Sequence, residues 1–94
     1  MKQIIEFSSK VEKFPDQMGW FYVKVPQKLL PKDLPTINQW KFTKIKATVG
    51  KTTWDTSLLP MKDGIKFIAL KAEVRKKEGI KLGDKVKISF SIQY

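Results

Sequence analysis

The sequence contains no cysteine and no histidine, and Arg75 is its single arginine among nineteen Lys plus Arg residues. The chain therefore lacks thiol nucleophiles, imidazole bases and disulfides, and it cannot ligate zinc, haem or iron–sulfur clusters through those side chains. Acidic residues are also few, nine in all, and they are scattered along the chain. Such scattering predicts neither a paired-carboxylate active site nor an oxygen-only Mg²⁺ or Ca²⁺ site. We therefore expect no metal, no cofactor and no enzymatic activity.

The composition is typical of a small folded domain. The 94 residues are 41% hydrophobic and 30% charged, with a net charge of +10. This length predicts a single domain over residues 1–94, with no second domain and a small core. No apolar run has the length of a membrane span, and Glu6 interrupts the apolar start of the chain, so we expect neither a membrane segment nor a signal peptide. The absence of cysteine favours a reducing compartment, and the cytoplasm is the expected location.

Alternation of apolar with polar residues predicts that most of the chain is β-strand. The predicted strands cover residues 3–13, 20–25, 41–49, 52–58, 65–70 and 85–92. Gly50 and Lys51 predict a tight hairpin loop between the third and fourth strands, because glycine readily adopts a positive φ. Six short strands at regular spacing favour a small barrel over a doubly wound sheet.

Two short segments have helical rather than strand character. Over residues 70–78, apolar residues and a Glu–Lys pair recur at a spacing of four, and Gly79 follows where a helix C-cap is expected. Pro26 begins a second, shorter helical turn over about residues 26–30. Pro31 then prevents that turn from continuing.

Four strings of sequence resemble one known family in their order and spacing. They are GWFYVKVP (19–26), TTWDTSLLP (52–60), DGIKFIALKAEVRKKEGI (63–80) and GDKVKI (83–88). The chain resembles the bacterial domain-of-unknown-function family numbered nineteen-oh-five, and the segment from Arg75 to Val86 is the most specific part of the likeness. The resemblance implies a double-split β-barrel and no activity. The expected fold is therefore mostly β, a six-stranded double-split barrel with one short α-helix.

A shorter similarity concerns residues 68–86. This run is similar to the swapped-hairpin DNA-binding domains of AbrB-type transition regulators and MazE-type antitoxins, although a helix, a Gly-Asp turn and a strand also form a common way of turning a chain. Those domains complete their barrel by dimerising. Here a strand followed by helical residues occurs twice within the chain, so one copy has enough elements to close a barrel. We expect a monomer, with a dimer as the alternative.

Cationic residues on the predicted helix and on the outer faces of two predicted strands form a first candidate site. This basic set comprises Lys44, Lys46, Lys71, Arg75, Lys76, Lys85 and Lys87. With the net charge of +10, it predicts binding of an anionic partner, either a nucleic acid or another polyanion, through contacts to phosphate. The alternative is a solvated surface that serves solubility. The scarcity of arginine weighs against recognition of a specific base sequence.

Aromatic and polar residues at an open barrel end form a second candidate site. This aromatic set comprises Trp20, Trp54, Asp55, Thr56 and Arg75. It predicts binding of a small ligand or a protein segment, with the Asp and the Arg close together. The alternative is that the two tryptophans belong to the core or the barrel mouth and that the Asp–Arg pair is structural. Trp40 is predicted to be the more exposed tryptophan.

Overall fold

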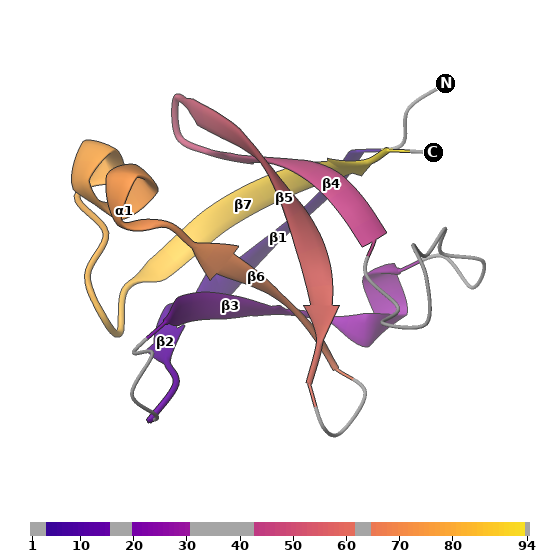
Figure 1. Ribbon diagram of the computed structural model, residues 1–94, viewed down its shortest axis with the longest axis horizontal. Coiled ribbons are helices and arrows are strands. Elements are labelled where there is room, and N and C mark those ends of the chain that lie inside the picture. The colour runs from indigo at the N-terminus through magenta and orange to yellow at the C-terminus, as the bar shows by residue number, and fades with distance from the viewer. Residues whose placement is uncertain (1–3, 16–19, 31–42, 62–64, 94) are drawn as a thin grey trace.

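The computed structural model describes residues 4–15, 20–30, 43–61 and 65–93. Within them the fold is mostly β, as the sequence predicts. The strands are β1 (Ile4–Lys10), β2 (Glu12–Lys13), β3 (Phe21–Val25), β4 (Thr43–Val49), β5 (Thr52–Pro60), β6 (Lys66–Leu70) and β7 (Lys85–Ile92). A 3₁₀ turn, η1 (Gln27–Leu29), follows β3, and a helix, α1 (Ala72–Glu78), follows β6. The strands form one curled, half-barrel sheet in the order β1-β7-β4-β5-β6-β3-β2 (Figure 1).

The strand count corrects the prediction of six strands, because the first predicted strand is divided at Val11. Val11 is fully buried. Its N–H donates to the carbonyl of Asp84 at 2.8 Å, and its carbonyl accepts from the N–H of Gly83 at 3.0 Å. Before this residue the chain pairs with β7, and after it the chain pairs with β3. The first and last strands of the sheet order are thus consecutive in sequence, which curls the sheet.

Both predicted helical segments are confirmed, with shifted bounds. The helix predicted from residue 70 begins at Ala72, because Leu70 still pairs with Phe21 at the end of β6. Gly79 ends the helix with a φ of 64°, a conformation that favours glycine. The N–H of Ile80 then donates to the carbonyl of Arg75 at 2.9 Å, which completes a Schellman-type C-cap.

The core lies inside the curl of the sheet. Alternate residues of the central strands point into it and are buried: Ile45, Ala47, Val49, Ile88, Phe90 and Ile92. Val74 of α1 belongs to the same cluster, so the helix closes one end of the core. A separate cluster is aromatic and consists of Phe14, Tyr22 and Phe67, whose ring centroids lie 4.1 to 5.6 Å apart.

The helix is attached to the β4–β5 hairpin through Glu78. The hydroxyl of Thr52 donates to the carboxylate of Glu78 at 2.5 Å. Gly50, in the hairpin loop, has a φ of 59°, and a Cβ at this position would overlap the Glu78 carboxylate. The φ of Gly50 confirms the predicted glycine turn, and the bond between Thr52 and Glu78 fixes α1 beside the start of β5.

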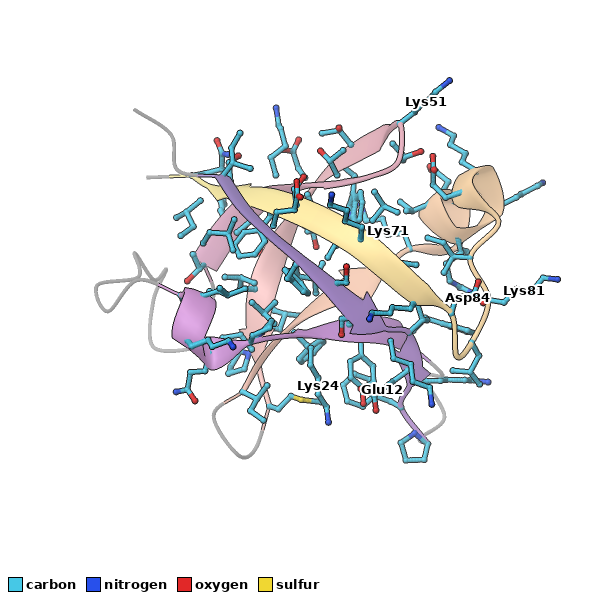
Figure 2. The ribbon with its side chains drawn as sticks, turned by 180° about the vertical axis from the view of Figure 1, so that it is seen from behind. Glu12, Lys24, Lys51, Lys71, Lys81 and Asp84 are labelled. Carbon is cyan, nitrogen blue, oxygen red and sulfur yellow. The ribbon has the colours of Figure 1, made fainter. Side chains whose placement is uncertain are left out.

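Charged residues on the surface make two polar contacts, one between β2 and β3 and one in the turn before β7. Lys24 of β3 lies 3.9 Å from Glu12 of β2, on the side of the molecule seen in Figure 2. In the turn, the carboxylate of Asp84 accepts a hydrogen bond from the N–H of Lys81 at 2.8 Å. Across the described ranges, no helix is long and apolar enough to cross a membrane.

Candidate functional site

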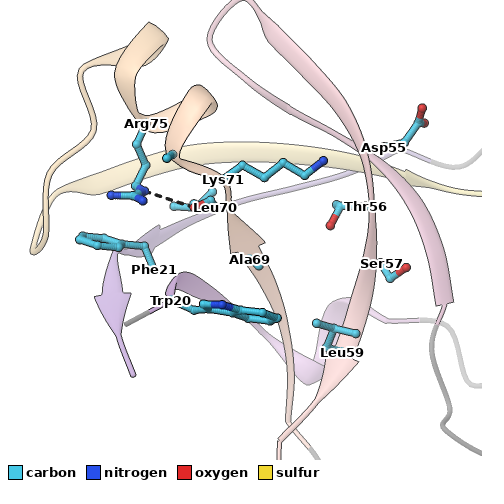
Figure 3. A pocket seen from close by; sticks show the side chains of 11 residues that line it. Trp20, Phe21, Asp55, Thr56, Ser57, Leu59, Ala69, Leu70, Lys71 and Arg75 are labelled. Carbon is cyan, nitrogen blue, oxygen red and sulfur yellow. Dashed lines mark hydrogen bonds between the residues drawn. The ribbon is translucent and has the colours of Figure 1, made fainter. Parts of the chain in front are cut away.

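An open groove separates β5 from β6. These strands pair only at Leu59–Phe67 and Pro60–Lys66. β5 pairs with β4 from Thr52 to Leu58, and β6 pairs with β3 along its whole length, but elsewhere β5 and β6 do not pair with each other, so the sheet splits between them. The groove has a volume of about 610 Å³. Its lining comprises Trp20, Phe21, Asp55, Thr56, Ser57, Leu59, Ala69, Leu70, Lys71, Ala72 and Arg75 (Figure 3).

The position of each β5 side chain follows from the alternation along the strand. Trp54 lies opposite the buried Ala47 and packs against the core, as one of the two interpretations of this tryptophan expects. It does not line the groove. Asp55 and Ser57 have the opposite parity, so their side chains are on the outer face, while their backbone borders the groove. Thr56 contributes its side chain to the groove wall.

Arg75 is held in one orientation at the helical end of the groove. The carbon of its guanidinium lies 3.8 Å from the ring centroid of Phe21. Its Nε donates to the carbonyl of Leu70 at 3.2 Å. Stacking and this bond together fix the plane of the guanidinium, and among the described residues its terminal nitrogens have no hydrogen-bond partner.

Lys71 and Trp20 lie on either side of the groove opening. Lys71 precedes α1 in an extended conformation, and its exposed side chain runs across the groove towards Thr56 (Figure 3). Trp20 is 43% exposed and presents its ring beside Ala69. Within the described ranges, no acidic side chain forms an ion pair with Lys71 or Arg75.

The structure separates the members of the basic set. Lys71 and Arg75 line the groove, whereas Lys76 is exposed elsewhere on α1. The four strand lysines of the set are exposed on the outer face of the sheet: Lys44, Lys46, Lys85 and Lys87. Lys44 and Lys46 are neighbours on one face of β4, and Lys85 and Lys87 are neighbours on one face of β7, about 7 Å apart in each pair.

Register gives the spacing of these strand lysines. Lys46 lies opposite Ser91, which is four residues along β7 from Lys87. At the usual strand rise this separates the two lysines by about 13 Å. Lys87 also pairs with Glu6 at 3.0 Å.

Four of the five residues in the aromatic set come together at the groove, since only Trp54 lies elsewhere. The expected closeness of Asp55 and Arg75 does not produce an ion pair among the described residues. Asp55 instead lies opposite Lys46 on the outer face. A second hollow is lined by Lys44, Ile45, Asp55, Thr56, Ser57 and Gln93. Trp40 lies outside the described residues, so its exposure stays a prediction.

Sequence reasoning missed the apolar part of the groove and the support of Arg75. Phe21, Leu59, Ala69 and Leu70 line the groove, although no sequence pattern separates them from other strand residues. An aromatic partner for Arg75 could have been predicted, because arginine is better suited than lysine to stacking on an aromatic ring and this chain has a single arginine. The structure shows that this partner is Phe21.

The arrangement defines a class of protein: a half-barrel domain with a solvent-open, cation-bearing groove where the sheet splits. Residues 7–90 match the family described as Domain of unknown function (DUF1905), so the chain belongs to that family, as the resemblance of its sequence strings indicates. A comparison with curated proteins finds no match. The second similarity, to swapped-hairpin DNA-binding domains, stays a prediction.

Proposed function

We propose that this chain is a non-enzymatic binding module whose groove holds an anionic ligand with a flat apolar part. The observation that carries the proposal is the pairing of two cations, Lys71 and Arg75, with the exposed ring of Trp20. Neither cation is neutralised by an acid in the described ranges. A carboxylate or a phosphate would supply the missing countercharge.

The fixed orientation of Arg75 favours binding. A flexible cation loses conformational freedom when it binds an anion, and this loss reduces the affinity. Arg75 has already lost much of that freedom, because it stacks on Phe21 and donates to Leu70. Its remaining N–H groups form a planar fork that matches the geometry of a carboxylate or phosphate.

The rest of the groove suits an apolar group. Leu59, Ala69 and Leu70 form an apolar wall, and Trp20 offers a ring on which a flat group can stack. The volume of about 610 Å³ falls within the usual range for small-molecule sites. Thr56 supplies a hydroxyl that can orient a polar edge.

A titration with naphthoate tests this proposal, with naphthamide as the uncharged probe of the same shape. We expect naphthoate to bind more tightly than naphthamide. Lys71→Gln and Arg75→Gln should each weaken naphthoate binding about tenfold, because each removes a charged hydrogen bond. Lys76→Gln is the matched control, since it removes one positive charge from α1 at a position outside the groove. Equal losses in all three variants would show that only overall charge matters.

A nucleic acid is the second candidate partner, and the exposed strand lysines favour it. Lys44, Lys46, Lys85 and Lys87 are spread over the outer face, and the net charge is +10. The test is anisotropy of labelled duplex DNA, single-stranded DNA and RNA at low and at physiological salt. Binding that persists at physiological salt and falls in a Lys44→Gln/Lys46→Gln variant supports this partner. Binding that vanishes with salt and is equal for all three polymers reduces the charge to a solubility feature.

A further inference from the structure

The split between β5 and β6 leaves a stretch of strand edge open in the middle of the sheet. β5 pairs with β4 from Thr52 to Leu58 on one side, but on its other side it pairs with β6 only at Leu59 and Pro60. Open strand edges are usually shortened, covered or charged in soluble proteins. Here the open edge of β5 instead borders a groove of about 610 Å³.

The register shows which backbone groups point into this groove. A two-residue loop joins Val49 to Thr52, so these residues form a hydrogen-bonded pair of the β4–β5 hairpin. Hydrogen-bonded and non-hydrogen-bonded pairs alternate along an antiparallel ladder. The pairs of Asp55 with Lys46 and of Ser57 with Lys44 are therefore non-hydrogen-bonded.

It follows that Asp55 and Ser57 direct their N–H and carbonyl groups away from β4. Leu59, which has the same parity, directs its own groups towards Phe67 of β6. No backbone hydrogen bond of Asp55 or Ser57 across the groove joins them to another described residue. Each residue thus offers one donor and one acceptor to whatever occupies the groove. On the facing strand, Ala69 has the parity of Phe67 and is likewise turned towards β5.

We propose that the groove binds an extended peptide segment that adds as a strand along Asp55–Ser57 of β5, with an acidic side chain on Lys71 and Arg75. This inference rests on the proposed function and names its ligand class. Strand addition supplies affinity through main-chain hydrogen bonds and specificity through pockets for alternate side chains. The apolar wall and Trp20 accept a neighbouring apolar side chain of the same segment.

The chemistry of the edge favours a peptide over a nucleic acid. Asp55 and Ser57 alternate donors with acceptors along β5, and the spacing of these groups is that of another peptide backbone. A DNA backbone offers acceptors but no donors, so it leaves the two carbonyl groups without partners, and an RNA backbone offers donors only through its 2′-hydroxyl groups. Lys71 and Arg75 lie together at the helical end of the groove. One acidic side chain in the peptide can therefore contact both cations, and a run of acidic residues is not needed.

The experiment uses the capped pentapeptide acetyl-Leu-Val-Glu-Val-Leu-amide, monitored by nitrogen–proton correlation NMR on the full chain. We expect the largest shifts at the backbone amides of Asp55, Ser57 and Ala69. Two further peptides carry N-methyl groups on alternate residues, one on the odd and one on the even positions. If the segment adds to β5, one of them should bind at least about tenfold more weakly, because it loses the donors that face the strand. Equal binding of all three peptides would overturn strand addition.

A proline variant tests the same edge from the protein side. Ser57→Pro removes the N–H that faces the groove and leaves the β4 ladder intact, because that N–H does not bond to β4. We expect Ser57→Pro to weaken the pentapeptide about tenfold. Thr53→Pro is the matched control, since it has the same parity on β5 but does not line the groove. Thermal unfolding of both variants checks that they fold. If neither folds, the N-methylated peptides still decide the question.

The outcomes separate this inference from the proposed function. Naphthoate binding that depends on Lys71 and Arg75, without peptide binding, overturns strand addition and leaves the proposed function standing. Failure of both ligands overturns both. Shifts of the groove amides by oligothymidylate but not by the peptide would replace the peptide with a nucleic acid and contradict the inference.

Discussion

Arg75 differs from its neighbour Lys76 on the same helix in how its side chain is held. Its guanidinium is stacked on Phe21, and its Nε bonds to Leu70. Lys76, the next residue, is exposed and has neither contact. Both carry one positive charge, so the difference between them lies in preorganisation rather than in charge.

Replacement of the ring beneath Arg75 tests this difference. Phe21→Leu retains an apolar side chain but removes the π-face, so we expect the free energy of unfolding to fall by about 1 kcal/mol. Naphthoate binding should weaken in the same variant, because the guanidinium regains its freedom. Urea denaturation and a naphthoate titration measure the two effects. Unchanged affinity for naphthoate would show that stacking does not prepare Arg75 for binding.

Thr43 offers a second test at the scale of one residue. It is fully buried, and its hydroxyl has no hydrogen-bond partner in the described parts of the chain. A buried hydroxyl without a partner is destabilising, whereas a methyl group of similar size is not. We therefore expect Thr43→Val to raise the free energy of unfolding by about 1 kcal/mol. A loss of stability in urea denaturation would contradict this.

At the scale of elements, contact between α1 and the β4–β5 hairpin holds one end of the groove. Glu78 joins the helix to Thr52, and Gly50 leaves room for its carboxylate. α1 carries Arg75, and Lys71 immediately precedes it, so this contact sets where the two cations lie relative to β5. The hairpin is therefore part of the support of the site, although neither Gly50 nor Thr52 lines it.

Two glycine substitutions distinguish backbone conformation from close packing. Gly79→Ala introduces a Cβ into open space at a φ of 64°, so its cost is conformational, about 1 kcal/mol. Gly50→Ala has a similar φ but must also displace Glu78, so it should cost more, at least about 2 kcal/mol. Adding Glu78→Ala should bring the cost of Gly50→Ala close to that of Gly79→Ala. Equal costs without that second change would contradict the packing argument.

Several elements were predictable from the sequence because they depend on local rules. The alternation in β4, β5 and β7, the glycine turn at Gly50 and the cap at Gly79 all follow from periodicity and from the left-handed conformation of glycine. The break at Val11 was not predictable, because it is made by hydrogen bonds to Gly83 and Asp84 far along the chain. Helix onset was displaced for a similar reason, since pairing with β3 extends β6 to Leu70.

At the scale of the whole molecule, the composition predicts an anionic partner but does not predict where that partner would bind. The net charge of +10 does not by itself distinguish one cation from another. Folding then placed Lys71 and Arg75 in the groove and left the strand lysines on the outer face. Which cations share a site depends on the split between β5 and β6, and no spacing in the sequence encodes that split. The grouping of Trp20 with Thr56 and Arg75 was nevertheless predicted, from their place in the family strings.

The curl of the sheet also leads to a prediction of the oligomeric state. β1 and β2, at the two ends of the strand order, are consecutive in sequence, so the sheet returns to its own first strand. A second copy is not needed to complete this arrangement, and we expect a monomer. Sedimentation equilibrium at micromolar concentration should give a mass near 10.9 kDa. Twice that mass would contradict the prediction and would favour a binding face shared by two copies.

The single arginine provides the most direct test of the central claim, that the groove binds anions through prepared cations. In a nitrogen–proton correlation spectrum of this chain, the one arginine Nε–H signal belongs to Arg75. We predict that naphthoate shifts this signal in a saturable manner and that naphthamide does not, with the groove amides moving in parallel. An Arg75 signal that stays in place while naphthoate shifts other residues would contradict the account.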